Sequence, residues 1–62
     1  MILPEFLSQD DRGYRHLRGH RIGPDDVVHF YREGESPEMI HLRFPTVSVP
    51  LLYKVIAFYL EN

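Results

Sequence analysis

In the first third of the chain, hydrophobic and polar residues alternate loosely in two short runs on either side of a turn-like segment. The runs are residues 5–9 and 14–18, and the segment between them reads Asp10-Asp11-Arg12-Gly13. Aspartate early and glycine late are typical of a tight turn, because aspartate bonds nearby backbone N–H groups and glycine adopts positive φ. Residues 1–22 are therefore predicted to form a β-hairpin arm.

From residue 23 onward the apolar positions follow helical spacing, and three segments open with a proline in the first turn. The openings are Gly23-Pro24-Asp25-Asp26, Ser36-Pro37-Glu38 and Ser48-Val49-Pro50. Proline suits this place because its missing N–H would be unpaired there anyway. Serine caps a helix, and acids near its start are favoured by the helix dipole. Gly34 and Pro45 are expected to end the first two helices.

The second of these helices has more apolar residues than one narrow stripe needs. We expect Met39 and Leu42 to face inward, with Ile40 and Phe44 as further inward candidates.

The third helix, over residues 51–60, is apolar almost all round, with Lys54 as its one charged residue. A helix that covers a single core shows one apolar stripe, so this one is expected to be buried on more than one side. A chain of 62 residues cannot wrap a helix completely, and we expect a homodimer with this helix at the interface. The expected interface residues are Tyr53, Val55, Ile56, Phe58 and Tyr59.

The predicted fold class is mainly α, with a short N-terminal β-hairpin followed by a three-helix bundle. One domain covers residues 1–62, as a hairpin arm over 1–22 and a three-helix core over 23–62. The last two helices, joined by Pro45-Thr46-Val47-Ser48, have the proportions of a helix-turn-helix.

Composition limits how such a chain is stabilised and where it works. A core of this size contributes roughly 3–5 kcal/mol, so disulfides, a metal or oligomerisation usually add to it. The chain has no cysteine, which removes disulfides and thiolate metal sites and fits a cytoplasmic location. A formal net charge of −2 limits nucleic-acid binding to a local patch. No signal peptide or membrane span is expected, since the longest apolar-rich stretch is about half the required length.

Several segments from about Leu17 to the C-terminus carry a family resemblance. They are Gly19-His20-Arg21-Ile22, Asp26-Val27-Val28, residues 33–40, Phe44-Pro45, Tyr53 and residues 57–62. Together they resemble the Domain of Unknown Function 433 family, and residues 33–40 are the most specific part. The sequence departs from the family at His20, where threonine is usual, and at Gly23-Pro24, where proline and an apolar residue are usual.

The resemblance implies a small bacterial or archaeal protein with a helix-turn-helix-like core. Such proteins are widely regarded as VapB-type antitoxins that pair with a PIN-like nuclease toxin. The resemblance therefore implies a protein partner of that class and an antitoxin role.

Four arginines, Arg12, Arg15, Arg18 and Arg21, recur at every third position, and no acidic residue lies between Asp11 and Asp25. They could contact phosphates, from a β-ribbon or a loop. They could also pair with the clustered carboxylates that hold Mg²⁺ in a PIN-like nuclease, because arginine binds carboxylates bidentately. A solvated arginine-rich surface is the third interpretation.

DNA reading by the last helix has little support in the sequence. A recognition helix reads base edges with polar side chains, and arginine, asparagine and glutamine are the usual readers. This helix offers Lys54 and Tyr53 in its first two turns. The pattern favours two packed helices in a small bundle.

No arrangement in the sequence indicates catalysis, a cofactor or a metal. His16 and His20 are four residues apart, but Gly19 and the predicted strand argue against a helix there, and no third ligand is evident. No carboxylate pair, nucleophile setting or glycine-rich phosphate loop is found. We therefore expect a binding protein and not an enzyme. The leading hypothesis is an antitoxin that neutralises a PIN-like ribonuclease, with binding of its own operon left open as an additional role; the alternative is a stand-alone DNA-binding regulator or a dimerisation module.

Overall fold

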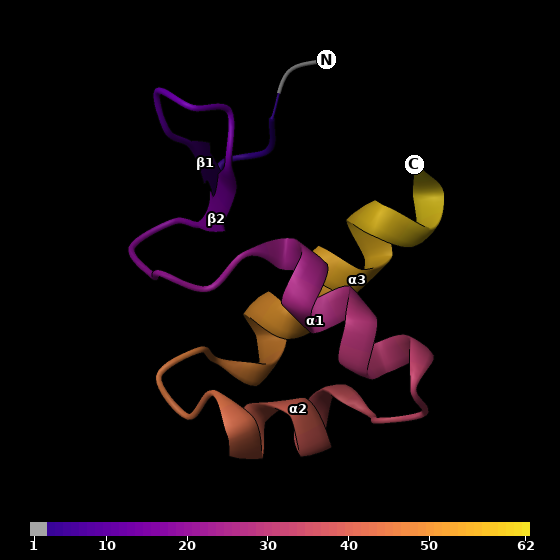
Figure 1. The fold of residues 1–62 in the computed structure, drawn as a ribbon. Coiled ribbons are helices and arrows are strands. Elements are labelled where there is room, and N and C mark those ends of the chain that lie inside the picture. The colour runs from indigo at the N-terminus through magenta and orange to yellow at the C-terminus, as the bar shows by residue number, and fades with distance from the viewer. Residues whose placement is uncertain (1–2) are drawn as a thin grey trace.

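The computed structural model describes residues 3–62 and shows a two-stranded hairpin followed by three helices (Figure 1). The elements are β1 (Leu7–Gln9), β2 (Arg15–Leu17), α1 (Pro24–Arg32), α2 (Pro37–Arg43) and α3 (Val49–Glu61). The predicted fold class, mainly α with an N-terminal β-hairpin, is confirmed.

The hairpin is antiparallel, and its register pairs Leu7 with Leu17, Ser8 with His16 and Gln9 with Arg15. Its turn follows from the residues between the strands. The Gly13 N–H donates to the Asp10 carbonyl at 3.0 Å, and Gly13 has a φ of +87°, which glycine adopts without strain.

The end of α1 is a glycine-dependent cap. Gly34, at φ +103°, donates its N–H to the Tyr31 carbonyl at 3.0 Å, and the Glu35 N–H reaches the Phe30 carbonyl at 3.1 Å. These two bonds form a Schellman motif, which satisfies carbonyls left open at the end of the helix. The sequence prediction that Gly34 ends this helix is confirmed.

Serine side chains begin the other two helices, as expected. The Ser36 hydroxyl accepts from the Met39 N–H at 3.2 Å, and the Ser48 hydroxyl accepts from the Leu51 N–H at 3.3 Å. The connection between α2 and α3 is closed by a 2.6 Å hydrogen bond between His41 Nδ1 and the Val47 carbonyl. His41 therefore fixes the corner between the two helices.

An ion pair outside the core joins the α1–α2 connection to the end of α2. The Arg43 guanidinium donates to both carboxylate oxygens of Glu35 at 2.6–3.0 Å. The guanidinium carbon of Arg43, Cζ, lies 4.2 Å from the centroid of the Phe30 ring, in cation–π geometry. Desolvation acts to raise the pKa of the Glu35 carboxyl, but the Arg43 hydrogen bonds act more strongly and lower it.

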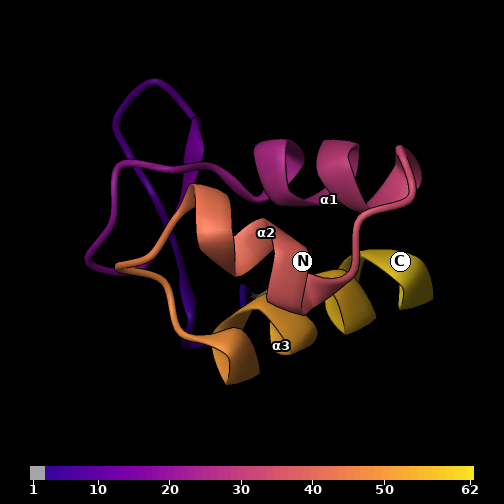
Figure 2. The ribbon, with the colours of Figure 1, turned by 90° about the horizontal axis from the view of Figure 1, so that it is seen from below.

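One hydrophobic core joins the hairpin and the helices. α3 packs against both α1 and α2, and β2 contacts α1. α2 lies at one end of the bundle, below α1 and α3 in Figure 1, and Figure 2 views the bundle from that end. The buried side chains are Leu7, Leu17, Val27, Ile40, Val47, Leu52, Val55 and Ile56.

The inward face of α2 differs from the expectation. Ile40 is fully buried and Phe44 packs against the core, whereas Met39 is 50% exposed and Leu42 is 80% exposed. Ser36, Pro37 and Pro45 set where α2 begins and ends. The rotation of α2 about its axis is set by its packing against α1 and α3. Met39 and Leu42 therefore face outward, which corrects the prediction.

The inner half of α3 belongs to the core of its own chain. Leu52, Val55 and Ile56 are at most 5% exposed. This corrects the expectation that Val55 and Ile56 lie at an interface with a second chain, because they have almost no surface left to offer. Hydrophobicity around α3 shows that it is buried, but does not show which chain buries each side.

Candidate partner-binding surfaces

The structure gives Arg18 a different role from the other hairpin arginines. Its Nη2 donates to the Leu7 carbonyl at 3.2 Å, and its Nε donates to the Glu5 carbonyl. The Arg18 N–H also donates to the Phe6 carbonyl at 2.8 Å. Arg18 therefore ties the entry of β1 to the exit of β2, and its guanidinium serves the hairpin itself.

Arg12, Arg15 and Arg21 make no side-chain hydrogen bond or ion pair within residues 3–62. Arg12 lies in the hairpin turn and Arg21 in the loop after β2, and both are exposed. Turn and loop are at opposite ends of the hairpin (Figure 1). The four arginines thus do not gather into one patch: Arg12 and Arg21 are presented at separate ends.

Arg15 faces the helices, where it lines a hollow of about 290 Å³ with Gly13, Tyr14, Asp25 and Tyr59. A neighbouring hollow of about 310 Å³ shares Asp25 and Tyr59 and adds two basic side chains of α1, His29 and Arg32. Asp25 is the one carboxylate among these lining residues. The two hollows therefore bring together two arginines and one aspartate, and His29 lies 3.8 Å from Glu33.

Asp10 organises the hairpin turn and does not act as a free carboxylate. Its Oδ1 accepts the N–H groups of Arg12 at 2.9 Å and Tyr14 at 3.0 Å, and its Oδ2 lies 3.3 Å from His16 Nε2. Desolvation acts to raise the Asp10 pKa, but the hydrogen bonds from Tyr14, His16 and Arg12 outweigh it and lower the pKa. The turn that displays Arg12 is therefore held by Asp10.

The outward side of α2 and of the first turns of α3 is apolar and acidic. Tyr53 donates its hydroxyl to Glu38 at 2.7 Å, which joins α3 to α2. That hydrogen bond lowers the pKa of Glu38 and raises the pKa of Tyr53. The exposed Met39 and Leu42 flank this pair on α2. A carboxylate held there would repel DNA phosphates, so the tertiary structure adds to the sequence argument against groove reading by α3.

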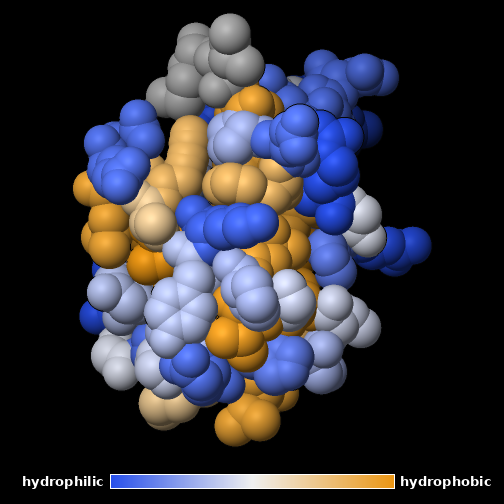
Figure 3. All heavy atoms as spheres, turned by 180° about the vertical axis from the view of Figure 1, so that it is seen from behind, coloured by the Kyte–Doolittle hydropathy of each residue, from blue (hydrophilic) through white to orange (hydrophobic). Residues whose placement is uncertain are grey.

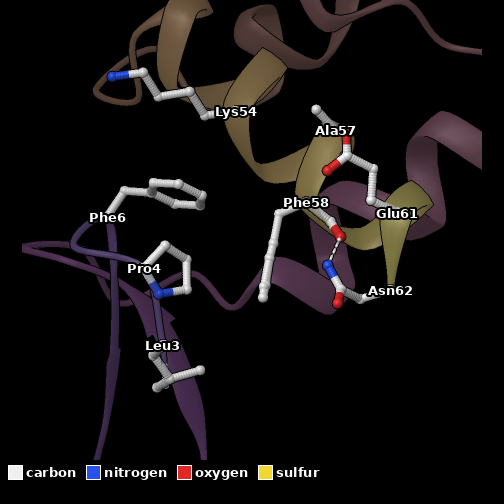
Figure 4. A pocket seen from close by; sticks show the side chains of 8 residues that line it. All are labelled: Leu3, Pro4, Phe6, Lys54, Ala57, Phe58, Glu61 and Asn62. Atoms are coloured by element: carbon white, nitrogen blue, oxygen red, sulfur yellow. Dashed lines mark hydrogen bonds between the residues drawn. The ribbon is translucent and has the colours of Figure 1, made fainter. Parts of the chain in front are cut away.

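A groove of about 570 Å³ runs between the N-terminal segment and the second half of α3 (Figure 4). Its lining residues are Leu3, Pro4, Phe6, Lys54, Ala57, Phe58, Glu61 and Asn62. Phe6 and Phe58 meet edge to face across it, with ring centroids 6.2 Å apart. The groove thus has an apolar floor and charged residues from α3 along its rim.

The space-filling view from behind shows hydrophobic side chains reaching the surface between hydrophilic ones (Figure 3). Of the residues expected at an interface, Tyr53 is 50% exposed, and Phe58 and Tyr59 are half-buried. The sequence analysis missed Ala57, Leu60 and Glu61, which α3 also presents outward. Ala57 and Glu61 follow Lys54 by three and seven residues, and Leu60 follows Tyr53 by seven; this helical spacing is the signal that could have found them.

Neither a metal-binding cluster nor a membrane-spanning helix is found in the described part of the chain. In residues 3–62, no three histidine or acidic side chains come together in a way that could hold a metal ion. None of the helices in this part of the chain has both the length and the apolar character needed to cross a membrane.

The fold and these surfaces define a small helical domain that presents side chains from a hairpin and from a terminal helix. The family model for Protein of unknown function (DUF433) matches residues 12–59. The chain belongs to this family, as the resemblance in residues 17–62 predicted. Comparisons with curated proteins and with solved structures found no match.

Proposed function

We propose that this protein is an antitoxin-like binding protein of a type II toxin–antitoxin module, which neutralises a PIN-like ribonuclease and is not itself an enzyme. The observation that carries the proposal is the state of the hairpin arginines. Arg12 and Arg21 are exposed on short loops and make no side-chain hydrogen bond within residues 3–62. They are therefore available to an acidic partner.

Arginine suits this task because its planar guanidinium binds a carboxylate through two parallel hydrogen bonds. Arg43 shows that geometry within this chain, with both Glu35 oxygens at 2.6–3.0 Å. A PIN-like nuclease holds Mg²⁺ with clustered carboxylates. An arginine carried on a hairpin turn would reach such a cluster and compete with the metal.

Binding of the operon's DNA is the second candidate function. The DNA would contact the arginines of the two hollows and not α3. Arg15, His29 and Arg32 line adjoining hollows there, and Arg12 lies in the neighbouring turn. Phosphates would meet Arg15 and Arg32 there, at a site that also holds the carboxylate of Asp25. In this case DNA contacts would be mainly to the backbone, with little sequence reading by a recognition helix.

The first experiment is a pull-down of this protein from its native cells, followed by mass spectrometry and light scattering of the purified complex. A stoichiometric small nuclease supports the proposal. Recovery of the protein without any nuclease, under conditions that retain other stable complexes, contradicts the antitoxin role and leaves the DNA-binding candidate to be tested.

The second experiment measures inhibition of the captured nuclease by variants. Arg12→Gln and Arg21→Gln are expected to weaken inhibition by about tenfold or more, because each removes a charge-assisted pair. Arg32→Gln is the matched control, since it removes an exposed arginine outside the hairpin. Equal inhibition by all three variants contradicts a role for the hairpin arginines.

Duplex binding at several salt concentrations distinguishes the second candidate. Contacts to phosphates make log K fall linearly with log salt, and removal of one contact reduces the slope by about one. If Arg15→Gln lowers the slope and nuclease inhibition is absent, the DNA-binding function is supported.

A further inference from the structure

The outward side of α3 carries four residues at helical spacing, Pro50, Lys54, Ala57 and Glu61, here called the outer stripe. All four are exposed, while Leu52, Val55 and Ile56 on the other side are buried. Lys54, Ala57 and Glu61 also line the same groove, which confirms that they share one face (Figure 4). The outer stripe is therefore a continuous surface about three helical turns long.

Lys54 and Glu61 are the two charges of the outer stripe, and neither has an ion-pair partner within residues 3–62. They are seven residues apart, so the helix rise separates them by roughly 10 Å and they cannot pair with each other. The residue four positions after Lys54 is Phe58, and the residue four positions before Glu61 is Ala57. Neither is charged, so neither can form an ion pair within the helix. Within the described residues, both charges are therefore open to an opposite charge on a second molecule.

We propose that a second copy of this chain binds there, with the two α3 helices antiparallel about a twofold axis. The axis passes between Ala57 and Phe58, because that point lies about 5 Å along the helix from both Lys54 and Glu61. Lys54 then faces the partner's Glu61, and Glu61 faces the partner's Lys54. With the axis at that point, each contact occurs twice, as an isologous interface requires.

The rest of the surface suits close helix packing. Ala57 lies nearest the axis, and its small side chain lets the two helices approach. Exposed Tyr53 (50%) and Leu60 (63%) flank the outer stripe on one side, and Phe58 with its neighbour Phe6 flanks it on the other. The charged pairs would therefore sit within an apolar surround, as in interfaces with an apolar centre.

The size of the chain also favours a second copy. A chain of 62 residues without cysteine has a small core and no disulfide to support it. Its exposed surface is 4543 Å². A standard interface covers about 800 Å² of each partner, roughly a sixth of that surface. The proposal does not depend on the antitoxin function.

Charge reversal tests the pairing directly. Analytical ultracentrifugation of the full chain is expected to show a concentration-dependent dimer. Lys54→Glu and Glu61→Lys should each weaken it by about tenfold or more, because symmetry turns both attractive pairs repulsive. The double variant restores opposite charges across the interface and should recover most of the affinity. Circular dichroism confirms that each variant remains helical.

A wild-type chain that stays monomeric up to millimolar concentration overturns the proposal. So does a double variant that is as weak as the two single variants, since that result places the two side chains away from each other. Asp11→Lys, which reverses an exposed charge in the hairpin turn, is the matched control and should leave the dimer unchanged.

Cysteine cross-linking tests the position of the axis. The chain contains no cysteine, so Ala57→Cys introduces one thiol per copy. Near the axis the two thiols meet and should oxidise to a covalent dimer in high yield. Asp11→Cys, in the exposed hairpin turn, is the matched control and should cross-link poorly. Equal yields from the two variants contradict an axis close to Ala57.

Discussion

Within α2, Ile40 and Leu42 are two residues apart and experience opposite surroundings. Ile40 is 0% exposed and packs in the core, whereas Leu42 is 80% exposed. Both are large aliphatic residues, and the sequence pattern wrongly favoured Leu42 over Ile40 as the inward residue. Their difference arises from the rotation of a seven-residue helix that both α1 and α3 contact.

Truncation of these two residues should have unequal effects. Ile40→Ala removes buried methyl groups and leaves a cavity, which costs about 2–5 kcal/mol and is comparable to the whole stability of a small domain. Leu42→Ala changes an exposed site and should alter stability by at most about 0.5 kcal/mol. Urea denaturation followed by circular dichroism measures both. Similar losses from the two variants would contradict the assigned rotation of α2.

Glu35 and Arg43 determine a second residue-scale property, the dependence of stability on pH. The folded-state pKa of Glu35 lies below its usual value of 4.5, mainly because Arg43 donates hydrogen bonds to the carboxylate. A depressed pKa adds stability that is present above the unfolded value and is lost as pH falls through the folded value. Asp10 and Glu38 are shifted in the same direction.

Acidification from pH 7 to pH 3 should therefore lower the urea midpoint of the wild-type protein. In Glu35→Gln the fall should be smaller, because the variant cannot lose a carboxylate that it lacks. Asp11→Asn is the control, since Asp11 makes no side-chain hydrogen bond in the described residues. A pH dependence unchanged by Glu35→Gln would show that this ion pair does not contribute.

Among the elements, α3 depends most on its serine cap. Its first turn consists of Val49, Pro50 and Leu51, none of which has a polar side chain. The Ser48 hydroxyl accepts the Leu51 N–H at 3.3 Å, and α3 has no acidic residue in its first turn to add to this cap. α2 has both the Ser36 cap and Glu38 in its first turn. The start of α3 thus rests on one side-chain contact.

Ser48→Ala should destabilise the protein by about 1 kcal/mol, the usual cost of removing an N-cap. Thr46→Ala, in the same connection but outside the cap, should cost less. Thermal unfolding at one protein concentration compares them. A Thr46→Ala loss equal to that of Ser48→Ala would indicate that the connection, and not the cap, limits stability.

Over the whole molecule, the hairpin and the helices share one core. Leu7 and Leu17 of the hairpin are at most 1% exposed and belong to the same cluster as Val27 and Val55. An arm that only rested on the helices would leave such residues partly exposed. The hairpin is therefore a structural part of the domain and not an appendage.

Unfolding should accordingly be a single cooperative transition. Far-UV circular dichroism reports the helices, and the methyl NMR signals of Leu17 report the hairpin. Both should give the same urea midpoint, as two-state behaviour requires. An earlier loss of the Leu17 signals would show that the hairpin unfolds on its own and would contradict the shared core.

The sequence by itself determined where the elements begin and end, because those signals are local. Gly13 and Asp10 define the hairpin turn, Ser36 and Ser48 begin two helices, and Gly34 ends another through backbone bonds within a few residues. Each of these was predictable from the chemistry of a short segment.

Only the tertiary structure decided which side of each element is buried and which charges remain available. Val55 and Lys54 are adjacent on α3, yet one is in the core and the other on the outer stripe. Arg18 bonds the carbonyls of Glu5 and Leu7, residues distant in sequence, while Arg21 does not. Such differences depend on segments that folding brings together, and a local pattern carries no information about them.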